Sequence, residues 1–116
     1  IKEENLEELI KNGLIVGKNF NMQRGTIIDN SHCWLIEIGD NVTLAPRVHI
    51  LAHDASTKRE LGYTKIGKVK IGNNVFIGAN TTILPNVIIG DNVIIGANSL
   101  VNKNILSNTV VARKSN

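Results

Sequence analysis

Aromatic residues are scarce in this chain, at 3% of its 116 residues. The core is therefore built almost without rings, and Ile, Val and Leu must supply its buried surface. Long hydrophobic runs are missing too, since no apolar segment reaches the roughly 18 residues of a membrane span. No signal-peptide pattern opens the chain. These absences predict one compact domain of branched aliphatic residues.

Cysteine is almost absent as well. Cys33 is the only one, so an internal disulfide is excluded and a reducing cytoplasm is the expected setting. We expect Cys33 to be a partly buried residue without a chemical role rather than a nucleophile. The formal net charge is +3, and no stacking aromatics lie between the scattered basic residues. This pattern suits an anionic small ligand and argues against a nucleic-acid-binding surface.

A six-residue repeat is the strongest pattern that is present, and it starts at Ile71. Its units are IGNNVF, IGANTT, ILPNVI, IGDNVI, IGANSL and VNKNIL. The first position is always aliphatic, the second is often glycine, and the fifth is small or β-branched. Two more units, IGDNVT and LAPRVH, occupy residues 38–49, and weaker units begin at Val16, Met22 and Ile28.

A period of six fits neither a helix nor an alternating strand, but it fits a short strand followed by a tight corner. Positions one and five are expected to point inward, and glycine and asparagine at positions two to four are expected to supply positive φ at the corner. Three units close a triangular coil, and coils stack about 4.8 Å apart. The predicted fold class is all-β, a parallel β-helix in the form of a single-stranded triangular prism.

Four segments depart from the repeat. Residues 1–13 are predicted to form a short capping helix, with Leu6, Leu9 and Ile10 on one face and Gly13 as its stop. The β-helix is then expected over residues 14–112, with an irregular stretch at 31–37 and an extruded polar loop at about 52–68. Residues 113–116 are a tail.

Three stretches together resemble the hexapeptide-repeat acyltransferases, and within them the branch of galactoside and maltose acetyltransferases and polysaccharide O-acetyltransferases. They are IEIGDNVTLAP, HILAHDAST and VKIGNNVFIGANTTILPNVIIGDNVIIGANSLVNKNI. The resemblance, which covers about residues 14–112, implies a left-handed coil and acetyl-CoA as co-substrate, with no metal. It also implies a homotrimer with active sites between subunits, and a hydroxyl of a sugar, nucleotide-sugar or polysaccharide unit as acceptor.

Acetyl transfer to a hydroxyl needs a general base, and histidine is the usual one near neutral pH. The chain offers His32, His49 and His53. His53 opens the polar stretch HDASTKRELGYTK, and its place in LAHDAS resembles that of the family's catalytic histidine. His49 is at an outward position and is expected at the surface or in a trimer contact. His32 either lines an acceptor pocket or has no chemical role.

The resemblance also implies residues for the two substrates. On the acceptor side these are Asp29 and Asn30, in TIIDNSH, and Asp54 is a further candidate because it follows the expected base and would orient the base or the acceptor. On the coenzyme side the matching positions are Phe76 near the thioester, Ala79 and Ala97 at turns, and Asn102 with Lys103 near the phosphates. Arg113 and Lys114 are additional basic residues for phosphate.

Two other functions stay open on the sequence alone. A non-catalytic trimeric β-helix scaffold needs the repeat but not the His53 loop or the coenzyme positions. A zinc enzyme like the β-helical carbonic anhydrases needs three histidines shared across an interface, and three histidines are present.

Overall fold

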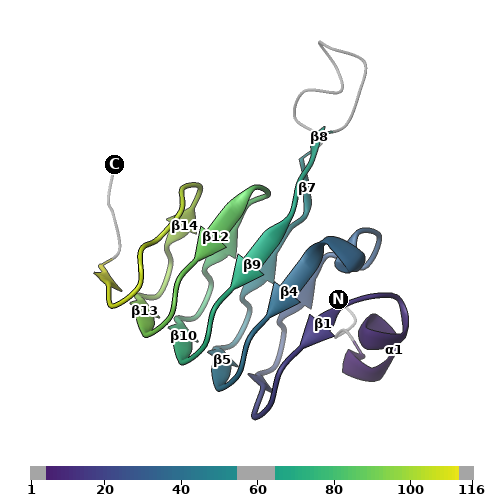
Figure 1. The fold of residues 1–116 in the computed structure, drawn as a ribbon, viewed down its shortest axis with the longest axis horizontal. Coiled ribbons are helices and arrows are strands. Elements are labelled where there is room, and N and C mark those ends of the chain that lie inside the picture. Colours follow the sequence, from purple (N-terminus) through teal and green to yellow (C-terminus); the bar gives the residue numbers. More distant parts are fainter. Residues whose placement is uncertain (1–4, 55–64, 113–116) are drawn as a thin grey trace.

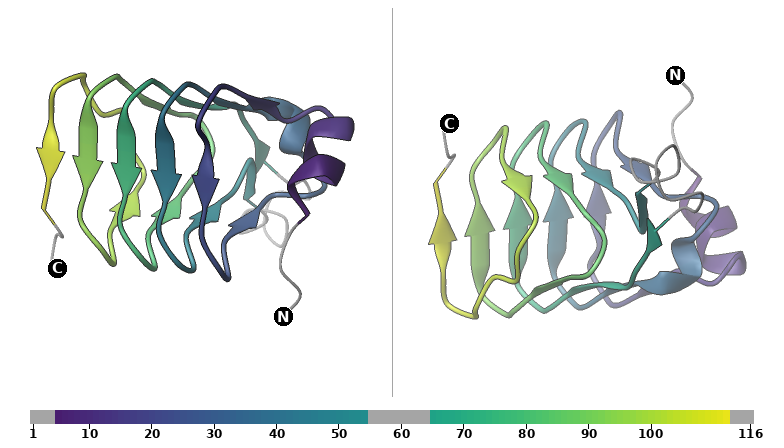
Figure 2. Two further views of the ribbon diagram at one scale, coloured as in Figure 1. Left: turned by 90° about the horizontal axis from the view of Figure 1, so that it is seen from below. Right: turned by 90° about the horizontal axis from the view of Figure 1, so that it is seen from above.

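The computed structural model describes residues 5–54 and 65–112. The described chain winds into a triangular prism whose three faces are parallel sheets (Figure 1). Neighbouring strands in each sheet come from successive coils, so the strands stack side by side along the prism (Figure 2). The coil is left-handed, as the resemblance implied.

The three faces are here called sheets A, B and C, in the order in which the chain visits them. Sheet A contains β1 (Ile15–Val16), β4 (Ile36–Ile38), β9 (Val69–Ile71) and β12 (Val87–Ile89). Sheet B contains β2 (Asn21–Met22), β5 (Val42–Leu44), β10 (Val75–Ile77), β13 (Val93–Ile95) and β15 (Val110–Val111). Sheet C contains β3 (Ile27–Ile28), β6 (His49–Ile50), β11 (Thr82–Ile83) and β14 (Leu100–Val101).

The side chains alternate as the six-residue pattern predicted. In β10, Val75 and Ile77 are buried while Phe76 between them faces out. Equivalent residues lie directly above one another, since Val75 is in register with Val42 on one side and Val93 on the other. Branched aliphatic side chains therefore stack on their own kind along the prism, which explains how the core forms almost without aromatic rings.

The corners between sheets A and B depend on asparagine. Asn41, Asn74 and Asn92 have φ values between 56° and 58°, in the left-handed region that asparagine tolerates. Their side-chain amides form a ladder, with Asn41 Nδ2 donating to Asn74 Oδ1 and Asn74 Nδ2 donating to Asn92 Oδ1, both at 3.1 Å. Asn19 and Asn108 extend the ladder at its two ends. One residue type thus sets the turn and links the coils.

Glycine at position two has a different role from the one expected. Positive φ was predicted there, but among the described glycines only Gly13 and Gly25 have it, and neither belongs to the regular units. A Cβ on Gly72 would instead lie 2.3 Å from Asp91 Oδ1 and 2.7 Å from the Gly90 carbonyl oxygen of the next coil. The prediction for position two was therefore wrong, and close contact between coils is what requires glycine.

The N-terminal helix, α1 (Leu6–Lys11), covers the first coil (Figure 1). The Asn5 side chain accepts hydrogen bonds from the backbone N–H groups of Glu7 and Glu8 and so caps it. Leu9 is buried against the core, whereas Ile10, expected on the same face, is 48% exposed. In residues 5–54 and 65–112, no helix has both the length and the apolar character that a membrane crossing requires.

One edge of the prism is less regular than the others. It consists of the segments that follow β3, β6, β11 and β14 and return the chain to sheet A, and we call it the C–A corner. After β3 the chain forms the 3-10 helix η1 (Cys33–Leu35), and after β6 it forms β7 (His53–Asp54), which pairs antiparallel with β8 (Lys65–Ile66). This pair projects from the prism (Figure 1). The expected loop at 52–68 begins and ends here, and its residues 55–64 lie outside the described residues, as does the tail at 113–116.

Candidate active site

The two expanded segments of the C–A corner lie in successive coils, so their side chains meet. β3 and β6 are neighbours in sheet C, with Ile28 in register with Ile50. Asp29 follows β3 and His53 follows β6 by a short step, which places His53 Nδ1 2.5 Å from Asp29 Oδ2. His32 joins them from the first segment, with its ring centroid 5.2 Å from that of His53.

Asp29 is the anchor of this cluster. Its side chain is 1% exposed, and its Oδ2 accepts hydrogen bonds from the Ala52 N–H at 2.9 Å and from His53. Oδ1 accepts from the Ser31 N–H and hydroxyl and from the His32 N–H, at 2.9–3.1 Å. A single buried carboxylate therefore holds the turn of its own coil and a side chain of the next.

The pairing determines which nitrogen of His53 carries the proton. Because an ionised carboxylate only accepts hydrogen bonds, Nδ1 must donate its proton to Asp29, and a neutral His53 then has its lone pair on Nε2. The His53 side chain is 36% exposed, so it is accessible from solvent. An oriented imidazole with a basic nitrogen directed away from its carboxylate partner is the arrangement of a general base.

Two opposing effects act on the pKa of Asp29. Burial raises the pKa of the carboxyl, but the hydrogen bonds from His53, Ala52 and Ser31 and the charge interaction with His53 outweigh burial. The net result is a pKa below the ordinary value of 3.8. Asp29 is consequently ionised at neutral pH, as the donor role of His53 Nδ1 requires.

The cluster also has the residue types of a metal site. The candidate ligand atoms of Asp29, His32 and His53 all lie within 4.8 Å of one another. Two histidines and a carboxylate are a common set of ligands for zinc or iron. However, both oxygens of Asp29 already accept hydrogen bonds, and a metal ion on Oδ2 would have to displace the His53 contact. The observed hydrogen bonds fit a positioned base better than a preformed metal centre.

The remaining acceptor-side candidates lie around this cluster. Asn30 is exposed at the start of the turn that Asp29 holds. Asp54 is half-buried on β7, where it pairs with Lys65 of β8 through the strand register. His49 is half-buried on β6, in register with Ile27 and Thr82, and it is not part of the Asp29 cluster.

The coenzyme-side candidates are spread over three parts of the chain surface. Phe76 is 44% exposed on the outer face of sheet B. Ala79 and Ala97 lie at the corner between sheets B and C, where the Asn98 N–H donates to the Ala79 carbonyl oxygen at 2.8 Å. Asn102 and Lys103 are exposed at the C–A corner after β14, on the same edge as His53. One chain by itself does not gather these five residues.

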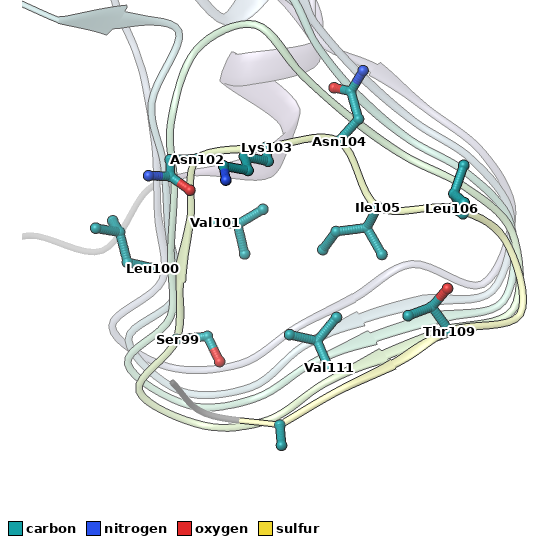
Figure 3. Close-up of a pocket in the computed structure, with 11 residues that line it drawn as sticks. Ser99, Leu100, Val101, Asn102, Lys103, Asn104, Ile105, Leu106, Thr109 and Val111 are labelled. Carbon is teal, nitrogen blue, oxygen red and sulfur yellow. The ribbon is translucent and has the colours of Figure 1, made fainter. Parts of the chain in front are cut away.

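A cavity of about 370 Å³ lies at the last described coil. Figure 3 looks along the coils and shows Val101, Ile105 and Val111 pointing into the triangle. Asn102 and Lys103 are among its lining residues, and of the lining residues within 65–112 Lys103 is the only titratable one. On sheet C, β14 is separated from β6 by β11, so the cavity lies about 10 Å along the prism from the His53 level. It lies at the last described coil of the aliphatic core, distinct from the histidine cluster.

The sequence indicated both Asp29 and His53 as candidate residues but did not predict their contact. Asp29 was expected to face the acceptor, and Asp54 was the candidate for orienting the base. A signal was present, because the six-residue register breaks twice, after Asp29 and after Ile50, and the two breaks fall at the same corner of adjacent coils. Counting coils from the repeat would have placed the two segments together.

Comparisons with known proteins agree with this architecture. A profile of the family described as bacterial transferase hexapeptide (six repeats) matches residues 68–103. A comparison with curated proteins found no match. Among solved structures, a maltose O-acetyltransferase from Clostridium difficile 630 is 32% identical, with a TM-score of 0.69. The match covers 97% of this chain and 73% of the maltose O-acetyltransferase chain.

Two further structures are longer than this chain. A hexapeptide-repeat acetyltransferase from Vibrio cholerae O1 biovar eltor, complexed with acetyl-CoA, is 25% identical with a TM-score of 0.75, covering 86% of this chain and 55% of its own. Serine acetyltransferase isoform 3 from Entamoeba histolytica, in complex with cysteine, is 26% identical with a TM-score of 0.70, covering 90% of this chain and 34% of its own. The chain thus spans about half of the first protein and a third of the second.

The matched repeats, the left-handed β-helix and the 32% identity over most of both chains lead to one assignment. This chain belongs to the hexapeptide-repeat family of bacterial transferases.

Proposed function

We propose that this protein transfers an acetyl group from acetyl-CoA to a hydroxyl of a sugar, free or within a nucleotide-sugar or polysaccharide unit. The observation that carries the proposal is the contact between Asp29 Oδ2 and His53 Nδ1. It leaves His53 Nε2 as the base, in a chain whose relatives include a maltose O-acetyltransferase and a protein complexed with acetyl-CoA.

The reaction needs one proton transfer in each direction. His53 Nε2 removes the proton of the acceptor hydroxyl as its oxygen attacks the carbonyl carbon of the thioester. The tetrahedral intermediate collapses, the carbon–sulfur bond breaks, and the leaving thiolate takes the proton back from the imidazolium. The products are an O-acetyl ester and free CoA. Asp29 holds His53 in the required tautomer and stabilises its transient positive charge.

The coenzyme is proposed to bind between two subunits of a homotrimer. Ala79 and Ala97 lie on a different corner from His53, and Phe76 lies on the outer face of sheet B. A neighbouring prism packed alongside would bring a B–C corner of one subunit against a C–A corner of the other. Backbone groups near Ala79 and Ala97 would then contact the pantetheine arm, and Asn102 and Lys103 would contact the phosphates.

The decisive experiment follows thiol release from acetyl-CoA against an acceptor panel. The panel contains maltose, a galactoside, a UDP-sugar, an oligosaccharide and L-serine. The parent protein is compared with His53→Ala and with His49→Ala, a matched control from the same coil. We expect His53→Ala to lose about 10²–10⁴ of the rate and His49→Ala to retain it. No release with any acceptor, together with no retention on a CoA resin, would overturn the proposal.

Sharing of the site between subunits has its own test. Sedimentation should give a trimer, and His53→Ala mixed with Ala97→Trp by joint refolding should recover part of the activity that each lacks alone. Recovery requires that His53 and Ala97 belong to the same active site but come from different subunits. A monomer, or mixtures as inactive as either variant, would contradict a shared site.

A metal enzyme is the second candidate, because Asp29, His32 and His53 are close enough to share an ion. Elemental analysis of the purified protein decides between the two functions. One equivalent of zinc per chain that is lost in both His32→Ala and His53→Ala, together with no acetyl transfer, would favour the metal enzyme.

A further inference from the structure

Trp34 is the only tryptophan in the chain, and 56% of its surface is exposed. It belongs to η1, in the expanded segment of the C–A corner that also carries His32. Its ring centroid lies 6.4 Å from that of His32 at an interplanar angle of 43°. The His32 ring lies 5.2 Å from that of His53 at 39°. The His32 ring therefore lies next to both of the other rings, and we call the three rings of His53, His32 and Trp34 the ring ledge.

The backbone beneath the ring ledge is held firmly. Cys33, next to Trp34, is completely buried, and its thiol contacts the carbonyl oxygens of Leu9 and Asn12 at 3.5 Å. Gly13, at the end of α1, is so close that an added Cβ would lie 2.6 Å from Trp34 Cβ. The stem of Trp34 is thus fixed between the turn and the helix, while its ring remains available. A binding surface that is ordered in advance costs little further ordering when a ligand binds.

The hydrogen bonds of the turn also set the tautomer of His32. The Ser31 hydroxyl donates its only proton to Asp29 Oδ1 at 2.9 Å, so it must accept from His32 Nδ1, which is also 2.9 Å away. Nε2 of a neutral His32 is then a hydrogen-bond acceptor. His53 and His32 consequently each have an acceptor nitrogen, and the exposed indole of Trp34 lies beside the His32 ring.

Two acceptor nitrogens and an exposed indole are together complementary to one kind of acceptor. A pyranose ring has hydroxyl groups around its edge and C–H bonds on its faces, and the electron-rich face of an indole attracts such C–H bonds. The two histidine nitrogens can each accept from a hydroxyl, one of which is the reacting group. The side chain of an amino acid such as serine has a hydroxyl but no extended C–H face to cover Trp34.

We propose that the ring ledge is the acceptor subsite, where a pyranose ring stacks on Trp34, donates a hydroxyl to His32 and presents its reacting hydroxyl to His53. This inference rests on the proposed acetyl transfer and adds which sugar class is accepted and which residues select it. Trp34 and His32 would act on acceptor affinity, whereas His53 would act on the chemical step.

Kinetics provide the first test. We expect Trp34→Ala to raise the KM for the sugar acceptor about tenfold, the change given by loss of one stacked aromatic face. The kcat and the KM for acetyl-CoA should stay within about twofold, and Trp34→Phe should recover most of the acceptor KM. His32→Ala should raise the acceptor KM in the same direction, with His49→Ala as the matched control. An unchanged acceptor KM in Trp34→Ala, or an equal rise in the KM for acetyl-CoA, would overturn the ring ledge.

Equilibrium binding provides the second test and does not need turnover. Because Trp34 is the sole tryptophan, its fluorescence reports on this site alone. Methyl glycosides and oligosaccharides titrated into His53→Ala should change the emission saturably, whereas L-serine should not. Free N-acetyltryptophanamide serves as the reference for nonspecific quenching. The absence of a saturable change with every sugar would overturn the ledge even where the parent protein transfers acetyl groups.

The two proposals fail in distinguishable ways. If Trp34→Ala transfers acetyl groups with an unchanged acceptor KM, the proposed acceptor subsite is wrong, while the proposed transferase activity still stands. If sugars change the Trp34 emission saturably but no thiol is released, the ring ledge is supported as a sugar site and the proposed transferase activity is contradicted. Sedimentation of Trp34→Ala completes the set, because dissociation of the assembly would show that Trp34 is a subunit contact and overturn its role in the acceptor subsite.

Discussion

Asp29 and His53 are 24 positions apart in the sequence, yet Oδ2 of the first lies 2.5 Å from Nδ1 of the second. The β-helix makes this contact, because one turn of the coil returns the chain to the same corner one strand spacing further along. Asp29 is almost fully buried and His53 is partly exposed. The pair thus has one member fixed in the protein and one that faces the substrates.

Replacing Asp29 by asparagine should slow the reaction more than it weakens binding. The side-chain amide that this substitution introduces can donate to His53 Nδ1, which would move the ring proton to Nε2 and remove the basic nitrogen. We expect Asp29→Asn to lower kcat by about 10²-fold or more, with the KM for acetyl-CoA within about threefold. Steady-state kinetics with the best acceptor of the panel measure both.

Glu37→Gln is the matched control for that variant, since Glu37 is an exposed carboxylate on the adjacent strand β4. It removes the same charge without touching the imidazole, so its kcat should equal that of the parent protein. A kcat that is unaffected by Asp29→Asn, or lowered equally by Glu37→Gln, would contradict the orienting role of Asp29.

Asp29 should also make stability depend on pH in the acid range. Its pKa is lower in the folded chain than the ordinary 3.8, so its ionised form stabilises the folded state. That contribution is fully present above pH 3.8 and is lost as the pH falls toward the folded-state pKa. The free energy of unfolding of the parent protein should therefore exceed that of Asp29→Asn at pH 7, and the gap should narrow below pH 3.8.

Urea unfolding of both proteins at pH 7, 5 and 3 measures the gap, at one protein concentration because assembly contributes to stability. A gap that widens between pH 5 and pH 3 would contradict the lowered pKa.

The fold could be predicted from the sequence because the residues within each six-residue unit determine the conformation of that unit. Ile77 and Val75 specify two buried positions, and Asn74 specifies the corner before them, so the arrangement follows without knowledge of distant residues. The role of glycine was missed for the opposite reason. Gly72 is required by the backbone of the next coil at Gly90, a contact that is visible only after the coils are stacked.

The candidate site was less predictable because it lies where the repeat stops. No local pattern indicates that Asp29 contacts His53 rather than an acceptor, since the contact depends on how the two irregular segments fold over one another. Trp34 was not singled out at all, although a lone exposed tryptophan in an aliphatic β-helix is unusual enough to be noticed. Its position beside His32 follows from η1, which no six-residue register predicts.

The asparagine ladder provides a test of what holds the corners. Asn74 combines a φ of 58° with two side-chain hydrogen bonds to neighbouring coils. Asn74→Gly loses the hydrogen bonds but keeps an unstrained corner, whereas Asn74→Ala loses both. The left-handed conformation costs alanine about 1–2 kcal/mol, and glycine loses roughly 0.5–1 kcal/mol more entropy on folding. We therefore expect Asn74→Ala to be less stable than Asn74→Gly by about 0.75 kcal/mol, the difference between the midpoints of these two ranges.

Urea unfolding of both variants beside the parent measures this difference, with Lys18→Ala as an exposed control expected within about 0.5 kcal/mol of the parent. An alanine variant at least as stable as the glycine variant would show that the corner does not depend on the left-handed conformation.

Cys33 should be unreactive in the folded protein. The residue is fully buried between the first coil and α1, and its thiol contacts two helix-end carbonyl oxygens. A thiol in such surroundings is shielded from reagents and is not favoured as thiolate. We expect Ellman's reagent to label the native protein at least about 100-fold more slowly than free CoA, and to label one thiol per chain at once in urea. Rapid stoichiometric labelling of native protein would show that α1 opens from the first coil. Slow labelling also means that the same reagent, added to an acetyl-transfer assay, reports released CoA rather than the protein's own cysteine.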